Sequence, residues 1–252
     1  MSWPGHGWSG WWSQWSWHCS DWSESDWQDG QKQSPQGGPL LCELGPATLR
    51  QKWVPFVQDW PRQSFALVLP RESGALPEAR LAEWFHRLHP QQLGQGGWSS
   101  AHHQGQELLR KTAWLVWPPC ECAYDYSDTR QEAASNPEMR AILEEITKYV
   151  AAACGVEDNP PNSVNLNFYP PGGGVGFHAD DEDLFDGLRQ ATRIISLSLA
   201  ESETLGKRFF EVRLKRGGSV KAVELRHGDL MTMEGFFQKH YVPWNALLED
   251  RP

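Results

Sequence analysis

Three side chains of this sequence could hold one metal ion. His178 and Asp180 are separated by one residue and follow a glycine-rich turn at the end of a strand-like segment. In an extended chain, residues i and i+2 point to the same face, so an imidazole and a carboxylate can converge on one ion. His240, within the strand-like run 238–242, offers a third ligand. Two histidines and one carboxylate form the facial triad that binds non-haem iron(II) and leaves positions open for a co-substrate and oxygen.

The His-x-Asp pair alone is weak evidence, because such a pair also occurs by chance on surfaces and in cores. Further motifs follow one another along the chain: Arg110–Trp114, Tyr124-x-Tyr126-Ser127, Asn167-Phe168-Tyr169, His178-Ala179-Asp180-Asp181-Glu182, Ile195–Leu199, Lys207–Phe209, and His227–Gly235 leading to His240. In kind and order these motifs resemble the AlkB family of dioxygenases. The resemblance covers roughly residues 64–252.

The resemblance implies a metal held by His178, Asp180 and His240, with Fe(II), 2-oxoglutarate and O2 as cofactors. Asn167 and Tyr169 match positions that hydrogen-bond 2-oxoglutarate; a buried strand pair satisfied by the backbone is the alternative. The implied reaction is oxidative dealkylation of N-alkylated nucleobases in DNA or RNA, of the DNA-repair type, which releases formaldehyde, succinate and CO2. In such chemistry the protein positions the target and excludes water, while the cofactors carry out the oxidation.

Aromatic side chains are the first candidates for contacts to the base. The family takes its base out of the stack, or from a single strand, and sandwiches it between rings. The resemblance implies Trp114, Tyr126 and His178 for this sandwich, with Tyr124 as a further aromatic contact, and Trp117 could replace Trp114. The alternative for each ring is an ordinary place in the core.

Two charged side chains complete the implied substrate site. Glu182 matches a family acid near the base edge, where a carboxylate could accept a hydrogen bond from an exocyclic amine; an exposed turn acid is the alternative. Arg208 is expected to contact substrate, the alternative being that it helps to solvate its strand.

The chain departs from the family pattern at its end. The family places an Arg-x-Asn-Leu-Thr-x-Arg strand shortly after the distal histidine, and its arginine pairs with the far carboxylate of 2-oxoglutarate. Here the sequence stops at Glu249–Pro252, and Arg251 is a poor substitute. A bidentate arginine–carboxylate contact is a strong polar interaction. We therefore expect a fragment that lacks the last barrel strand and binds 2-oxoglutarate weakly.

Charge is distributed unevenly. The whole chain carries a formal charge of -9, which gives no general attraction to nucleic acid. Residues 207–226 nevertheless carry about +5, and such a patch can contact phosphates; a solvated hairpin face is the alternative. The charges in this basic segment are Lys207, Arg208, Arg213, Lys215, Arg216, Lys221 and Arg226, against Glu211 and Glu224.

The elements that position these residues change in type along the chain. A strand is expected over 64–69, a helix from Leu76 to His89, and a second helix that begins after the N-cap Asn136, with Pro137 in its first turn, and ends at Gly155. Short strand-like runs then dominate: 163–169, 174–178, 193–200, 208–214, 219–225, 229–233 and 238–242. This order predicts an α+β fold with a double-stranded β-helix (jelly-roll) core and flanking N-terminal helices.

The N-terminal residues differ from the rest. Residues 1–38 hold eight tryptophans among Ser, Gly, Asp and Gln and no aliphatic side chains before residue 38, so we expect a disordered segment, either a sticky interaction tail or an extension with no defined role. Residues 39–63 are expected to form a linker, and residues 64–252 the dioxygenase domain.

Cysteine count and hydropathy indicate the compartment. Five irregularly spaced cysteines predict reduced thiols, and Cys120-x-Cys122 without a second pair argues against a zinc site. Neither a signal peptide nor a membrane-spanning run is found in the sequence. A soluble, intracellular protein of the nucleus or cytoplasm is expected.

Two rival functions stay open. One is an oxygenase of the same fold that acts on protein or lipid. The other is a non-catalytic nucleic-acid-binding fragment, which the absent arginine strand favours and the three metal ligands oppose.

Overall fold

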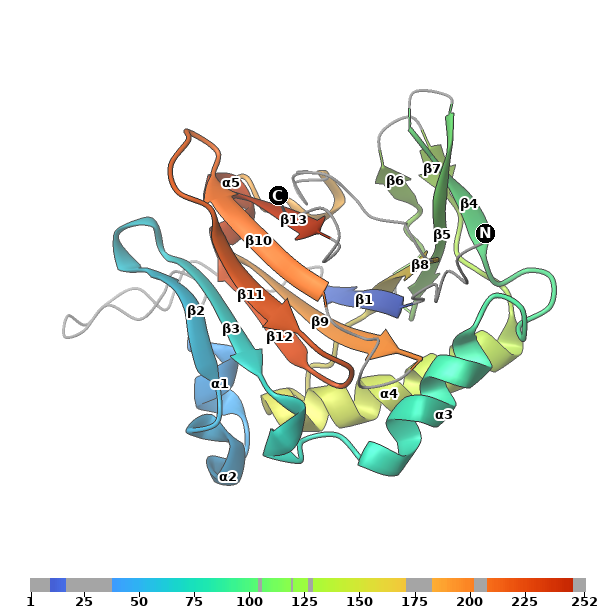
Figure 1. Cartoon of the computed structure of the whole chain (residues 1–252), viewed down its shortest axis with the longest axis horizontal. Helices are drawn as coiled ribbons and strands as arrows, with labels where there is room; N and C mark the ends of the chain where they lie inside the picture. The colour runs from blue at the N-terminus through green and yellow to red at the C-terminus, as the bar shows by residue number, and fades with distance from the viewer. Residues whose placement is uncertain are drawn as a thin grey trace, which may run out of the picture.

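A curved antiparallel sheet forms the centre of the molecule (Figure 1). The computed structural model describes residues 10–16, 38–103, 106–118, 120–126, 129–170, 183–201 and 208–246. The eight strands of the main sheet run in the order β2 (Val54–Asp59), β3 (Ser64–Leu69), β12 (Leu230–Gly235), β9 (Thr192–Ala200), β1 (Gly10–Ser16), β8 (Ser163–Tyr169), β5 (Gln106–Val116) and β4 (Ser99–His103).

A second sheet packs on one face of the main sheet. It consists of β11 (Lys221–Leu225), β10 (Arg208–Leu214) and β13 (Tyr241–Ala246). A two-stranded ribbon of β6 (Tyr124–Tyr126) and β7 (Thr129–Gln131) stands beside β5. Short 3-10 turns cover Trp60–Arg62 (η1), Arg71–Ser73 (η2) and Asp183–Phe185 (η3).

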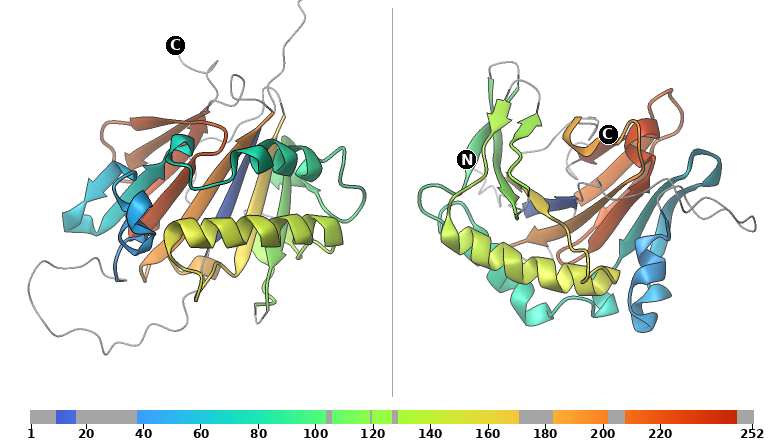
Figure 2. Two further views of the ribbon diagram at one scale, coloured as in Figure 1. Left: turned by 90° about the horizontal axis from the view of Figure 1, so that it is seen from below. Right: turned by 180° about the vertical axis from the view of Figure 1, so that it is seen from behind.

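Helices lie on the opposite face (Figure 2). α3 (Glu78–Leu88) and α4 (Pro137–Cys154) cross the main sheet, and the short helices α1 (Leu41–Leu44) and α2 (Ala47–Arg50) lie near β2 and β3. α5 (Phe237–His240) is a single turn between β12 and β13. With helices outside and two sheets facing each other, the predicted α+β jelly-roll class is confirmed.

Strand alternation gives the main sheet two cores. In β3, Phe65, Leu67 and Leu69 join the helix-side cluster, while Ala66 and Val68 join the cluster under the second sheet. The same period of two divides the side chains of β9 and β12 between these clusters. β3, β9 and β12 are therefore buried on both faces, and the second sheet covers the face that carries Tyr169.

Local signals explain α4. The Asn136 side chain accepts a hydrogen bond from the Met139 N–H at 2.9 Å, and Pro137 occupies the first turn. Gly155 ends the helix with φ of 69°, and a Cβ there would lie 2.3 Å from the Leu44 carbonyl oxygen. The predicted helix is confirmed at both ends, and its end glycine also lets α1 approach.

The first strand was not expected. β1 lies between β8 and β9 and pairs antiparallel with both, so that Trp12 is opposite Asn167 on one side and Ser198 on the other. The expectation of disorder is therefore wrong for residues 10–16. The other residues of 1–37 lie outside the described part. Backbone pairing on both edges holds this segment without aliphatic side chains, and composition alone could not reveal that.

Residues 39–63 are also more than a linker, because they supply α1, α2 and edge strand β2. Leu41 is fully buried, and its N–H donates to the Glu234 carboxylate at 2.9 Å. This entry segment is thus fixed to β12. Among the described residues, no helix is long and apolar enough to span a membrane.

The His227-Gly228-Asp229 motif joins the sheets. Asp229 accepts the backbone N–H groups of Arg71 and Arg226, both at 2.8 Å, and His227 Nδ1 accepts the Ala200 N–H at 3.0 Å. Gly228 adopts φ of 90° beside Leu81. These residues fix the turn that leads into β12. Since α5 follows the other end of β12, they also help to fix the position of α5.

Candidate active site

Strand β8 carries the two residues expected to bind 2-oxoglutarate. Asn167 and Tyr169 are two residues apart on this strand, and both are buried, with exposed fractions of 5% and 1%. β8 is fixed on both sides, by β5, where Thr112 is opposite Asn167, and by β1. The pair therefore lies on a rigid strand, as a small-molecule contact requires.

Arg208 lies against Tyr169, one member of this pair. Its guanidinium carbon is 4.3 Å from the centre of the Tyr169 ring, and only 7% of the residue is exposed. Burial lowers the pKa of Arg208 to about 10, while the nearby Tyr169 acts to raise it. The alternative that Arg208 merely helps to solvate its strand is wrong. The alternation Arg208-x-Phe210-x-Val212, with all three buried, was the sequence signal for an inward-facing arginine.

Two of the expected substrate aromatics form a separate cluster. Trp114 and Tyr124 stack on each other with ring centres 5.0 Å apart and planes 23° apart, and Phe185 meets Trp114 edge-on at 6.4 Å. Trp114 is fully buried, and its indole N–H donates to the Cys122 carbonyl at 2.8 Å. Because two stacked rings leave no gap for a third, a base cannot enter between Trp114 and Tyr124 in this arrangement.

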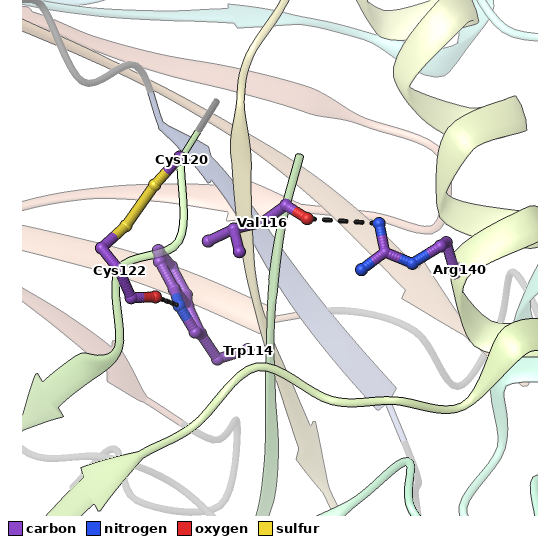
Figure 3. The surroundings of a disulfide bond; sticks show 5 residues. All are labelled: Trp114, Val116, Cys120, Cys122 and Arg140. Carbon is purple, nitrogen blue, oxygen red and sulfur yellow. Dashed lines mark hydrogen bonds between the residues drawn. A yellow bond between two sulfur atoms is a disulfide. The ribbon is translucent and has the colours of Figure 1, made fainter. Parts of the chain in front are cut away.

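A disulfide closes the loop beside this cluster (Figure 3). It joins Cys120 to Cys122, so the expectation of reduced thiols is wrong for this pair. Both cysteines pack against the Trp114 cluster, which brings their sulfurs together. Arg140 of α4 donates to the Val116 carbonyl at 3.2 Å, which anchors the end of β5 from the other side.

Two other cysteines are free thiols, as expected. Burial raises the pKa of the Cys42 thiol to about 11 and raises that of the fully buried Cys154 thiol further. Cys19 lies outside the described residues.

His240 is the one expected metal ligand within the described residues. It is the last residue of α5, and β13 begins at Tyr241, so the strand expected over 238–242 is wrong in its first half. Burial lowers the pKa of His240, and the cations of Lys239 and Arg62 lower it further. A lowered pKa keeps the imidazole neutral, the form that binds a metal.

Three expected site residues lie outside the described part: His178, Asp180 and Glu182. For Tyr126 the backbone of β6 is described and the side chain is not. Among the described residues no group of three or more metal-binding side chains occurs. This is expected, because two of the three assigned ligands, His178 and Asp180, are outside the described residues. The described donors do fit the implied groups, because His240 offers a neutral imidazole, and Arg208, Asn167 and Tyr169 offer a buried cation and polar groups suited to a dicarboxylate.

His240 also lines a pocket that the sequence did not predict as a unit. The pocket has a volume of about 260 Å³ and is lined by Arg62, Leu214, Lys215, Arg216, Lys239 and His240. Two of the four cations, Lys215 and Arg216, belong to the basic segment, and Arg62 and Lys239 join them from distant positions in the sequence. The pocket is strongly positive.

The comparisons with known proteins agree with this geometry. The model of the 2OG-Fe(II) oxygenase superfamily matches residues 72–246. This range includes the buried pair on β8, Arg208 and His240.

A curated human protein, "Nucleic acid dioxygenase ALKBH1", is 27% identical over 140 residues. The matched region covers 55% of this chain and 33% of the human protein. The chain therefore aligns with about a third of that relative's length.

Proposed function

Because this chain belongs to the 2OG-Fe(II) oxygenase superfamily, we propose that it oxidatively dealkylates N-alkylated bases in DNA or RNA. The chain is an AlkB-like dioxygenase, and its family uses Fe(II), 2-oxoglutarate and O2. The similarity to a human nucleic acid dioxygenase is the observation that favours a nucleobase over protein or lipid.

The cofactors supply the oxidation. When bound, Fe(II), 2-oxoglutarate and O2 convert an N-methyl group to a hydroxymethyl group, which leaves as formaldehyde, while 2-oxoglutarate becomes succinate and CO2. We assign the metal to His178, Asp180 and His240. The neutral imidazole of His240 supports its part in this assignment.

The residues on β8 and β10 hold the co-substrate in this proposal. Asn167 and Tyr169 contact it from a strand fixed on both sides. The buried charge of Arg208 beside Tyr169 favours an anionic ligand, because a carboxylate compensates a guanidinium that has lost water. We therefore propose that Arg208 contacts a carboxylate of 2-oxoglutarate. The contact between Arg208 and the substrate that the sequence suggested stays a prediction.

In this proposal the base would lie near the assigned metal ligands His178, Asp180 and His240. Trp114 and Tyr124 are already stacked on each other in the core, so they do not enclose the base between them. Direct contacts to the base come in this proposal from Tyr126, His178 and Glu182. The ribbon β6–β7, which lies beside β5 (Figure 1), excludes water from the site in this proposal. In this proposal a nucleic-acid substrate is compatible with the nucleus or the cytoplasm, and also with an organelle that holds nucleic acid.

Two product measurements test the proposal. CO2 release from 2-oxoglutarate is followed with added iron in the wild type, in His178→Ala and in the control Lys148→Ala, which alters an exposed residue of α4. Formaldehyde release is then compared between an N-methylated oligonucleotide and an N-methylated peptide. We expect both products with the oligonucleotide in the wild type and the control, and neither in His178→Ala. Equal background CO2 in wild type and His178→Ala would favour a binding protein, and formaldehyde from the peptide alone would favour the protein-directed oxygenase.

A further inference from the structure

We propose that the pocket beside His240 binds the phosphate groups of the nucleic-acid strand whose base is oxidised. This pocket, which we call the rim pocket, is lined by Arg62, Leu214, Lys215, Arg216, Lys239 and His240. The inference rests on the proposed function, and it adds a binding site for the backbone of the substrate to the site for its base.

Three chain segments meet at the rim pocket and are held by hydrogen bonds. The Lys215 N–H donates to the His240 carbonyl at 2.9 Å, which joins the end of β10 to the end of α5. The Phe236 N–H donates to the Gln63 carbonyl at 2.8 Å, which joins the turn after η1 to the start of α5. The walls of the pocket are therefore fixed relative to one another although their side chains are long.

Arg62 is oriented by an acid outside the lining. Its guanidinium donates to Asp59 at 3.0 Å, and the Tyr241 hydroxyl donates to the same carboxylate at 2.8 Å. The pKa of Asp59 is lowered: burial acts to raise it, but the hydrogen bonds from Tyr241 and Arg62 outweigh that effect. Asp59 is thus ionised near neutral pH and keeps Arg62 at the pocket wall.

The charge of the lining is positive throughout. Arg62, Lys215, Arg216 and Lys239 are all exposed, and none of the lining residues that the structure describes is acidic. Within the described residues, neither Arg216 nor Lys239 has a carboxylate within 4.0 Å, so their charge is available to a ligand. On a chain of net charge -9, such a local cluster attracts polyanions to one place and repels them elsewhere.

The exposure of these cations favours the phosphates of a nucleic acid over 2-oxoglutarate as the ligand of the rim pocket. The residues expected to bind 2-oxoglutarate, Asn167 and Tyr169, are buried and do not line the rim pocket. Exposed lysine and arginine heads suit phosphates that stay partly in water. Since His240 belongs both to the rim pocket and to the proposed metal site, a strand held here keeps a neighbouring nucleotide close to the metal.

A binding measurement without turnover tests the rim pocket. The probe is a short, unmodified, single-stranded oligonucleotide, and its affinity for the full chain is measured by fluorescence anisotropy over a range of salt concentrations. The test variant is Arg216→Ala/Lys239→Ala. The control Lys148→Ala/Lys221→Ala removes the same charge from two exposed residues that do not line the pocket, one of them inside the basic segment. Thermal melting of both variants verifies that they fold.

The expected result is a loss of affinity confined to the pocket variant. Binding should weaken roughly tenfold at physiological salt, and the slope of log K against log salt should become shallower by about 1.4, because two phosphate contacts are lost and each contributes about 0.7 on a single strand. The control should keep the wild-type slope. Equal losses in both variants, or no loss in either, would overturn the proposal.

A second titration separates the rim pocket from the co-substrate site. The affinity for 2-oxoglutarate, measured by calorimetry with Mn²⁺ in place of iron, should be unchanged in the single variant Arg216→Ala, which leaves Lys239 beside His240. If that affinity falls while oligonucleotide binding is kept, the pocket belongs to the co-substrate and the inference is wrong. A protein that binds the oligonucleotide through this pocket and releases no formaldehyde would support the inference and contradict the proposed function.

Discussion

The two ends of β10 place arginines in opposite surroundings. Arg208 begins the strand, is buried, and lies over Tyr169. Arg216 follows the end of the strand, is exposed, and lines the rim pocket. A buried cation interacts strongly with a small anion that is enclosed with it, whereas an exposed cation interacts weakly and in a salt-dependent manner. One strand thus links a site suited to a small co-substrate with a site suited to a polymer.

The largest expected effect concerns the junction beneath the rim pocket. Gly235 has φ of 72°, and a Cβ there would lie 2.1 Å from the Gln63 carbonyl oxygen. Gly235→Ala should therefore destabilise the protein by about 3 kcal/mol, measured by urea unfolding. Gly217, with φ of 89° and open space around it, is the matched control, and Gly217→Ala should cost only about 1 kcal/mol. Equal costs would mean that strain in φ, and not the close approach, decides.

The buried end of β10 should dominate co-substrate binding. Arg208→Met keeps much of the side-chain volume and removes the charge, and we expect the affinity for 2-oxoglutarate to fall by about 2 kcal/mol, or roughly 30-fold. Isothermal titration calorimetry with Mn²⁺ measures this change. Arg213→Met, on the same strand but exposed, should bind 2-oxoglutarate like the wild type. If Arg208→Met and Arg213→Met bind 2-oxoglutarate with equal affinity, the burial of Arg208 does not determine co-substrate binding.

The pH dependence of stability should show how Arg62 is held. A carboxyl whose pKa is lowered on folding stabilises the folded state above its unfolded pKa of about 3.9, and this contribution is lost as the pH falls through the folded value. Asp59 is such a group. Asp59→Asn should cost about 1 kcal/mol near pH 6, and the stabilities of wild type and variant should converge as the pH falls from about 3.9 through the lower folded pKa of Asp59. Tyr241→Phe removes one of the hydrogen bonds to Asp59 and should bring the folded pKa of this carboxyl closer to its unfolded value. A stability difference between wild type and Asp59→Asn that does not change with pH would argue against the ionised carboxylate.

The smallest effect should come from the exposed end itself. Arg216→Ala should change the free energy of unfolding by no more than about 0.5 kcal/mol, because an exposed cation without a nearby carboxylate contributes little to stability. Urea unfolding at low and high salt measures it. A larger loss would mean that Arg216 supports the fold, and would weaken its assignment to a ligand.

Local sequence signals predicted the elements that are specified locally. Asn136, Pro137 and Gly155 marked α4 because a cap, a first-turn proline and a left-handed glycine act within a few residues. The burial of Arg208 was missed because the segment 207–226 was treated as one basic stretch, and charge counts ignore strand alternation. The rim pocket was missed because Arg62 and Lys239 come from distant segments, and only the fold brings them to Lys215.

β1 was not predicted, for a different physical reason. Its pairing depends on two strands from the second half of the chain, and β-structure follows tertiary context more than intrinsic preference. The disulfide was missed because a Cys-x-Cys pair forms one only where the loop beside Trp114 brings the two sulfurs together. The candidate residues themselves followed from motif spacing and family resemblance, which require no knowledge of pairing.

The central place of β1 has a consequence for how the protein is made (Figure 1). β1 precedes the other described strands in the sequence and has no partner until β8 and β9 have been synthesised, so the middle of the sheet closes late and over a long stretch of chain. After β8, the proposed co-substrate strand, has joined it, β1 keeps one open edge until β9 has been synthesised. Newly made chains should therefore depend on chaperones during synthesis, and a bulky tag fused at residue 1 should slow maturation more than one fused elsewhere.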